Sequence, residues 1–229
     1  LDGARAEARA KRHAKGYRTA RENVADLVDE GSFQEYGQLA VAAQRSRRDY
    51  ADLQTSTAAD GIITGTCTIN ASLVGPQRAR AAVIVNDYSV LAGTQGYFHH
   101  KKLDRMLAVA EREQLPVVIY TEGGGGRPGD TDVATQVAEL DLPSFARWAG
   151  LAGTLPRIAV NNGFCFAGNF ALFGGPGFSS VDIDLEGTTQ DASDDTFTLH
   201  IGASYLWQIG VLLLSGATVF ALVQLIGVL

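Results

Sequence analysis

The sequence predicts an α/β layered fold built from repeated strand–helix units. Two short apolar runs, residues 116–120 and 157–161, predict buried strands, and each leads into a glycine-containing turn. Residues 62–69 alternate and are rich in β-branched side chains, and residues 81–85 are wholly apolar, so both predict strands. A hairpin-like connection over residues 71–80 joins them. Strands that alternate with helices favour a sheet covered by helices.

Helices are predicted before and between these strands. Residues 1–16 are rich in Ala, Arg and Lys, and Thr19 with Glu22 forms a capping-box pattern that predicts a second helix ending near Gly31. Residues 33–59 are poorly periodic and predict a docking arm with short turns. Further helices are expected over residues 97–114, 132–140 and 142–151.

The first turn, residues 121–130, contains four successive glycines between a strand and an expected helix. Without a Cβ at Gly124, Gly125 and Gly126, a ligand could approach the backbone N–H groups directly. Such amides, with a helix start behind them, favour an anion. A second glycine-containing turn, residues 162–168, follows the next strand. The pair predicts one carbonyl oxygen held from two sides.

Other interpretations of the first turn are weaker. Gly124, Gly126 and Gly129 fit the dinucleotide pattern G-x-G-x-x-G, but Pro128 interrupts it and no acidic residue follows about 20 positions later at a strand end. A P-loop is excluded because Asp130 stands where Lys is needed. A flexible connector remains the alternative, and the second turn favours the anion site over it.

Ordered motifs stand along most of the chain, at residues 12–16, 19–22, 60–65, 86–96, 100–102, 122–127 and 163–168. Together they resemble the carboxyltransferase component of biotin-dependent acyl-CoA carboxylases, in the version found in large multidomain enzymes. The resemblance covers residues 5–174 and implies a crotonase-like spiral of strand–helix units with an N-terminal helical arm.

The resemblance implies that backbone amides stabilise a thioester enolate. The expected catalytic positions are Gly124, Gly125 and Gly126 in the first turn, with Ala167 and Gly168 in the second. Hydratases of the wider superfamily carry a catalytic Glu three residues after the second-turn glycine. Ala171 stands there in this chain, which argues against hydration.

Substrate binding is expected from His100, Lys101, Lys102, Arg127 and Phe166. Cations in the first turns of a helix oppose its dipole, so residues 99–102 suggest a bound anion, with the CoA phosphates as the natural candidate. A solvated polar face is the alternative. Arg127 either steadies a carboxylate or clamps the loop to Glu122, and we favour the clamp.

The resemblance also implies cofactors and partners. Acyl-CoA is the expected substrate, and biotin is the expected cofactor, delivered as carboxybiotin on a partner domain or subunit. Biotin carboxylase, a biotin carboxyl carrier, a missing C-terminal carboxyltransferase half and a homo-oligomer are the expected partners. Cys67 and Cys165 are too few for a structural zinc site, so no metal is expected. No basic face broad enough for nucleic acid is visible.

We expect three parts: an arm over residues 1–59, a half-domain over 60–174 and a divergent segment over 175–229, where the charge composition changes. The last part has six acidic and no basic residues, and it accounts for the whole net charge of −6. Residues 201–229 form an uncharged apolar tail, long enough as a helix to span a bilayer. A buried core helix is the alternative.

The chain is therefore expected to be a carboxyltransferase component that moves a carboxyl group from carboxybiotin to the α-carbon of an acyl-CoA. Two alternatives stay open: a non-catalytic or membrane-tethered CoA-binding remnant, and a related decarboxylase component. The first 23 residues are charged throughout and fit no signal peptide. We accordingly expect a cytoplasmic protein with membrane association through residues 201–229.

Overall fold

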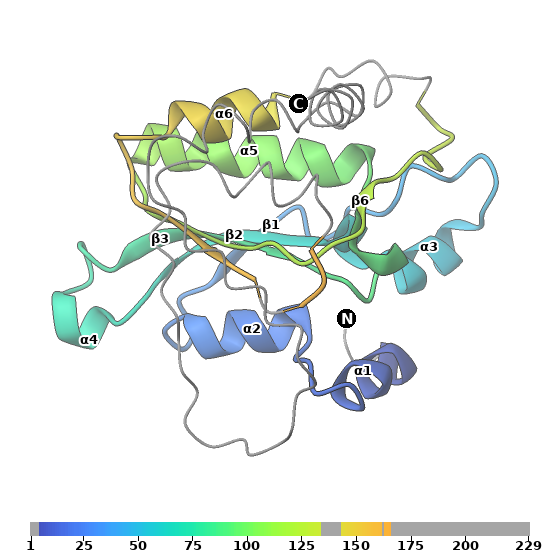
Figure 1. Cartoon of the computed structure of the whole chain (residues 1–229), viewed down its shortest axis with the longest axis horizontal. Helices are drawn as coiled ribbons and strands as arrows, with labels where there is room; N and C mark the ends of the chain where they lie inside the picture. The colour runs from blue at the N-terminus through green and yellow to red at the C-terminus, as the bar shows by residue number, and fades with distance from the viewer. Residues whose placement is uncertain (1–4, 134–142, 162, 166–229) are drawn as a thin grey trace, which may run out of the picture.

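The structure is a computed structural model that describes residues 5–133, 143–161 and 163–165. A five-stranded sheet with the strand order β1-β2-β3-β5-β7 runs through it (Figure 1). The first three strands pair antiparallel, and β3, β5 and β7 pair parallel. The strands are β1 (Gln34–Tyr36), β2 (Ile62–Thr68), β3 (Arg80–Asn86), β5 (Val117–Tyr120) and β7 (Arg157–Val160).

Helices cover both faces of this sheet. Figure 1 shows α5 and α6 on one face and α2 on the other, with α1 near the N-terminus. The α-helices are α1 (Ala6–His13), α2 (Ala20–Leu27), α3 (Tyr50–Ser56), α4 (Ala71–Val74), α5 (Tyr97–Glu113) and α6 (Ser144–Gly150). Two 3₁₀ turns, η2 (Ala58–Gly61) and η3 (Leu91–Gly93), precede β2 and a short parallel pair, β4 (Thr94–Gln95) with β6 (Gly125–Gly126).

The alternation of side chains along β3 explains the two layers. Ala82 and Ile84 are fully buried in the cluster that contains residues of α5 and α6. Val83 and Val85, one position along, belong to the cluster that contains Val24 of α2. A strand whose successive side chains point to opposite faces reads as a continuous apolar run when both faces are covered. The predicted α/β layered fold is confirmed.

The capping box predicted at the start of α2 is confirmed. The Thr19 hydroxyl accepts from the Glu22 amide at 3.2 Å, and the Glu22 carboxylate accepts from the Thr19 amide at 2.8 Å. The two bonds satisfy amides that have no partner within the helix. The local sequence pattern was therefore enough to fix this end of the helix.

The expected end of that helix near Gly31 is wrong, because α2 ends at Leu27. Asp29 explains the early end. Its amide donates to the carbonyl of Thr68 at 2.9 Å, and its carboxylate accepts from the amides of Asn70 and Ala71, both at 3.0 Å. These bonds to the β2–β3 hairpin outweigh another helical turn, and only the packing of α2 beside the hairpin makes them available.

The remaining predicted elements fall in three groups. The strands expected over residues 116–120 and 157–161 and the helix over 97–114 are confirmed as β5, β7 and α5. The expected arm supplies β1, paired with β2, and α3. The helix expected over 142–151 begins at Ser144 within the described residues. Most of the helix expected over 132–140 lies outside them, as does the whole of 175–229.

Candidate functional site

The parallel strands bring the two glycine-containing turns together. The carboxyl ends of β3, β5 and β7 lie at one edge of the sheet, where ligands commonly bind in α/β folds. The Gly123 amide donates to the carbonyl of Phe164 at 2.9 Å, and Gly123 forms a parallel bridge with Cys165. The first turn therefore lies directly against the start of the second, as the sequence predicted.

The first turn requires glycine at specific positions. Gly125 has a φ of +88°, a conformation that side chains with a Cβ rarely adopt. A Cβ on Gly124 would lie 2.7 Å from the carbonyl oxygen of Ala92. Gly126 is exposed, and a Cβ there would meet nothing within 4 Å. The turn is consequently packed on one side and open at Gly126.

Amides within this turn already have partners at three positions. Besides Gly123, the amide of Gly124 donates to the Gly93 carbonyl at 3.3 Å, and that of Arg127 donates to Gln95 at 2.8 Å. These bonds fasten the turn to η3 and β4. Gly125 and Gly126 lie between these bonded amides, in the strand β6 that pairs with β4, and of the two only Gly126 is exposed.

Arg127 is a clamp, as favoured from the sequence, but its partner is Asp60 rather than Glu122. Its Nη1 lies 2.5 Å from an Asp60 carboxylate oxygen, and its Nη2 donates to the Thr94 carbonyl at 2.6 Å. Both charged side chains are nearly inaccessible, 5% and 0% exposed. Burial raises the pKa of Asp60, and the neighbouring Arg127 opposes that rise. The guanidinium thus holds the turn against η2.

Anionic groups do lie at the start of α5, but they are carboxylates of the protein itself. The carboxylate of Asp130 accepts from the Tyr97 amide at 2.8 Å, and that of Asp60 accepts from the His99 amide at 2.7 Å. Acidic groups at a helix N-terminus are favourable because they face its positive end. Two carboxylates therefore sit where the sequence suggested CoA phosphates.

The polar side chains at the start of α5, residues 99–102, are buried except for Lys101. His100 is buried, with Nδ1 3.3 Å from the Ser144 hydroxyl, and burial lowers the pKa of His100 to about 4. Lys102 donates through Nζ to the carbonyls of Ala59, at 2.8 Å, and Ile62, and burial lowers the pKa of Lys102 to about 8. Of the three expected cations only Lys101 is exposed, so the structure does not bring them together as one anion site.

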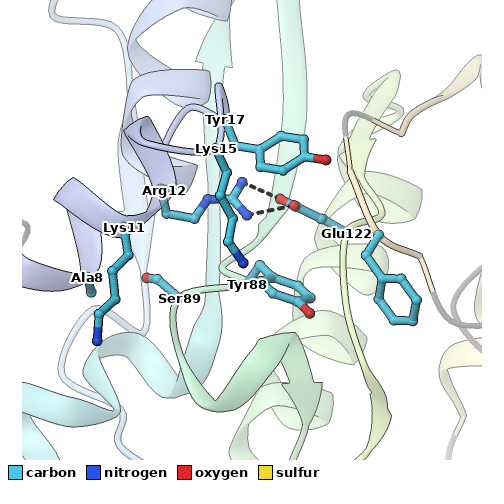
Figure 2. A pocket seen from close by; sticks show the side chains of 9 residues that line it. Ala8, Lys11, Arg12, Lys15, Tyr17, Tyr88, Ser89 and Glu122 are labelled. Atoms are coloured by element: carbon cyan, nitrogen blue, oxygen red, sulfur yellow. Dashed lines mark hydrogen bonds and ion pairs between the residues drawn. The ribbon is translucent and has the colours of Figure 1, made fainter. Parts of the chain in front are cut away.

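A buried ion pair that the local sequence did not indicate lies beside the two turns. Arg12 of α1 donates through both terminal nitrogens to the carboxylate of Glu122, each at 2.7 Å (Figure 2). The guanidinium also lies 5.1 Å from the ring centroid of Tyr17 and 5.7 Å from that of Tyr88. No spacing rule connects residues 110 positions apart, so sequence reasoning had no means of pairing them.

This ion pair borders a pocket of about 380 Å³ that Figure 2 shows from close by. The pocket is lined by α1, by the segment after β3 and by both turns, through Glu122 and Phe164. A Cβ on Gly163 would collide with the Glu122 carboxylate, so this glycine allows the second turn to approach the first. The pocket therefore opens at the junction of the two turns.

The remaining expected site residues lie outside the described part of the chain. These are Phe166, Ala167 and Gly168.

Cys165 is partly buried, and burial raises the pKa of its thiol, which disfavours a thiolate nucleophile there. In the described residues no group of His, Cys, Asp and Glu side chains could hold a metal ion, and no helix is long and apolar enough to cross a membrane.

Comparison with known proteins identifies relatives of this chain. Residues 11–171 match the carboxyl transferase domain family. The propionyl-CoA carboxylase beta chain of Saccharopolyspora erythraea is 32% identical over 161 residues, which are 69% of this chain and 27% of that one. The chain thus spans about a quarter to a third of the length of the curated relatives that it matches.

Solved structures give the same result for the fold. A single-chain, multi-domain long-chain acyl-CoA carboxylase is 55% identical with a TM-score of 0.70, over 76% of this chain and 17% of that one. The transcarboxylase 12S hexamer, solved with hydrolysed methylmalonyl-coenzyme A bound, is 25% identical with a TM-score of 0.60, over 74% of this chain and 32% of that one.

Proposed function

The chain belongs to the carboxyl transferase domain family, and we propose that it forms the acyl-CoA half of a biotin-dependent carboxyltransferase. The reaction moves a carboxyl group to the α-carbon of an acyl-CoA. Carboxybiotin, carried on a partner domain or subunit, would supply that group. Because the chain spans only part of its relatives, the remaining carboxyltransferase half belongs to the proposed active assembly.

The observation that carries this proposal is the contact between the two turns. The Gly123 amide donates to the Phe164 carbonyl, so Gly125 and the exposed Gly126 lie near the start of the second turn. A thioester enolate collects negative charge on its oxygen, and amide donors aimed at that oxygen stabilise it more than the neutral thioester. Gly168 in the second turn is proposed to supply the opposing donor.

Three finer proposals follow from the same family membership. The half-domain would form part of a crotonase-like spiral. The α-carbon would lose its proton and bond to the carboxyl carbon while the bond between that carbon and the biotin nitrogen breaks. The freed biotin nitrogen would accept the proton, since no carboxylate occupies the hydratase position at residue 171. Biotin carboxylase, a carrier and further copies of the chain would complete the assembly.

The test uses the full chain assembled with the complementary carboxyltransferase half, biotin carboxylase and a biotinylated carrier. Incorporation of labelled bicarbonate into propionyl-CoA or acetyl-CoA, with ATP present, measures the transfer. Gly125→Val should lower it on the order of 100-fold or more, as expected for loss of an oxyanion donor. An assembly without incorporation that still binds the CoA ester would support the non-catalytic alternative. Undiminished transfer by Gly125→Val would place the oxyanion elsewhere.

A further inference from the structure

The turn η2, which leads into β2, has an unusual backbone. Ala59, Asp60 and Gly61 have φ values of +55°, +50° and +72°, so three successive residues are left-handed. A Cβ crowds the following carbonyl in this region, and only glycine escapes that cost. Strained backbone of this kind persists where surrounding contacts hold it, and it concentrates at functional sites. The conformation of η2 therefore depends on its neighbours.

The start of α5 supplies the contacts that hold η2. Lys102 donates through Nζ to the carbonyls of Ala59, at 2.8 Å, and Ile62, on either side of Asp60. The His99 amide donates to the Asp60 carboxylate at 2.7 Å, and His99 Nδ1 lies 3.2 Å from the Asp60 carbonyl oxygen. All three polar side chains are buried. Two polar residues of α5 are thus used to fix the position of one carboxylate.

That carboxylate is connected to the glycine turn through Arg127. Besides its ion pair with Asp60, the Arg127 guanidinium donates to the Thr94 carbonyl at 2.6 Å, and its Nε lies 3.3 Å from the Thr94 hydroxyl. Thr94 belongs to β4 and pairs with Gly125 of β6, next to Gly126. A continuous series of direct contacts therefore runs from Asp60 to the strand that contains both glycines.

The space around this ion pair depends on Gly96, which precedes α5. Its φ of −101° is available to any residue, so the backbone does not require glycine here. A Cβ at this position would instead collide with the guanidinium of Arg127 and the carboxylate of Asp130. The missing side chain at Gly96 is consequently explained by the charged groups packed against it.

We propose that Asp60 is a positioning residue for carboxyl transfer, which acts through Arg127 on the placement of Gly125 and Gly126. Asp60 itself touches no substrate. The catalytic consequence rests on the proposed function, whereas the placement of the turn does not. Amide donors stabilise the enolate oxygen more than the neutral thioester, so a displaced turn lowers kcat and leaves KM nearly unchanged.

The placement of the turn can be measured without turnover, by amide hydrogen exchange of the full chain followed by mass spectrometry. Asp60→Asn keeps an acceptor for the His99 amide and tolerates the left-handed backbone, but it loses the charge that holds Arg127. The amides of residues 123–127 should then exchange about tenfold faster, while those of β3 stay as slow as before. Unchanged exchange over 123–127 would overturn the proposal.

A matched control is Glu35→Gln on β1. Glu35 also accepts two hydrogen bonds from one arginine, Arg21, each at 2.9 Å, and its side chain is 10% exposed. The change removes a carboxylate from an arginine pair that has no contact with the glycine turn. It should leave exchange over residues 123–127 unchanged. Equal acceleration by Glu35→Gln and Asp60→Asn would show general loosening and would overturn the proposal.

Carboxyl transfer by the complete assembly gives the second measurement. Asp60→Asn should lower kcat about tenfold and change the KM for propionyl-CoA by less than about twofold. Combined with Gly125→Ala, it should lower kcat by less than the product of the two single effects, because both changes act on one turn. Loss of folded protein would instead multiply the effects. Multiplied effects or an unchanged kcat would contradict a positioning role for Asp60.

Arg127→Lys provides a second variant for both measurements. It keeps a positive charge for Asp60 but lacks the planar group that also reaches the Thr94 carbonyl, so the same pattern with a smaller effect is expected. The outcome therefore does not depend on whether Asp60→Asn folds. An unmodified assembly without carboxyl transfer would overturn the proposed function, and hydrogen exchange would still decide whether Asp60 places the turn.

Discussion

Arg12 and Glu122 form a bidentate ion pair that joins the first helix to the glycine turn. The guanidinium is 9% exposed and the carboxylate 4%, so water screens the pair little. Arg12 also donates to the Arg18 carbonyl at 2.9 and 3.2 Å, which ties the segment after α1 back to that helix. The pair positions the residue that immediately precedes the glycines, and it makes the turn's geometry depend on α1.

Removing one partner of this pair should cost more stability than removing both. We expect Arg12→Met or Glu122→Leu alone to lower the free energy of unfolding by about 3 kcal/mol, because a charge is left buried without its partner. The Arg12→Met, Glu122→Leu double variant should lose less than either single variant, and therefore less than the sum of the single losses. Urea unfolding of the full chain, followed by circular dichroism, measures each term. Additive losses would mean that the pair contributes no coupling.

Gly125 should tolerate a small side chain less well than Gly126. Gly125→Ala forces a Cβ into a φ of +88° and should lower the free energy of unfolding by about 1–2 kcal/mol. Gly126→Ala adds its methyl group to open space and should change that free energy by less than about 0.5 kcal/mol. Thermal unfolding of the two variants side by side tests the difference. Equal stabilities would show that the turn relaxes freely at Gly125.

His100 should make the protein sensitive to mild acid. Burial lowers the folded-state pKa to about 4 from 6.5, so the unfolded chain binds more protons between these values. Stability from this group is present above pH 6.5 and is lost as pH falls toward 4. Between pH 7 and pH 5 the loss attributable to His100 should be about 2 kcal/mol.

The control for this pH dependence is His100→Asn, which keeps a polar group near Ser144 but does not titrate. Unfolding free energies of both proteins at pH 7 and pH 5 give the His100 contribution as a difference of differences. Carboxylates such as Asp60 titrate in both proteins, so their contributions to the pH dependence of the unfolding free energy largely cancel in this comparison. Parallel losses in the two proteins would show that His100 is not the acid-sensitive group.

Much of this protein was determined by the sequence through interactions between near neighbours. Three patterns each lie within a few residues: the β-branched alternation of β2, the apolar runs of β3 and β5, and the Thr19–Glu22 capping box. They can therefore be recognised from the local sequence. The contact between the two turns was also predictable, because parallel strands end at one edge of a sheet.

Only the tertiary structure decided where the long polar side chains go. Arg127 could have paired with the nearby Glu122, but packing of η2 beneath the turn placed Asp60 closer. Glu122 paired instead with Arg12, and Lys102 turned inward to the carbonyls of Ala59 and Ile62. Each of these side chains is long enough to reach several partners. Which partner lies within hydrogen-bonding distance depends on how separate elements pack, and no local pattern encodes that.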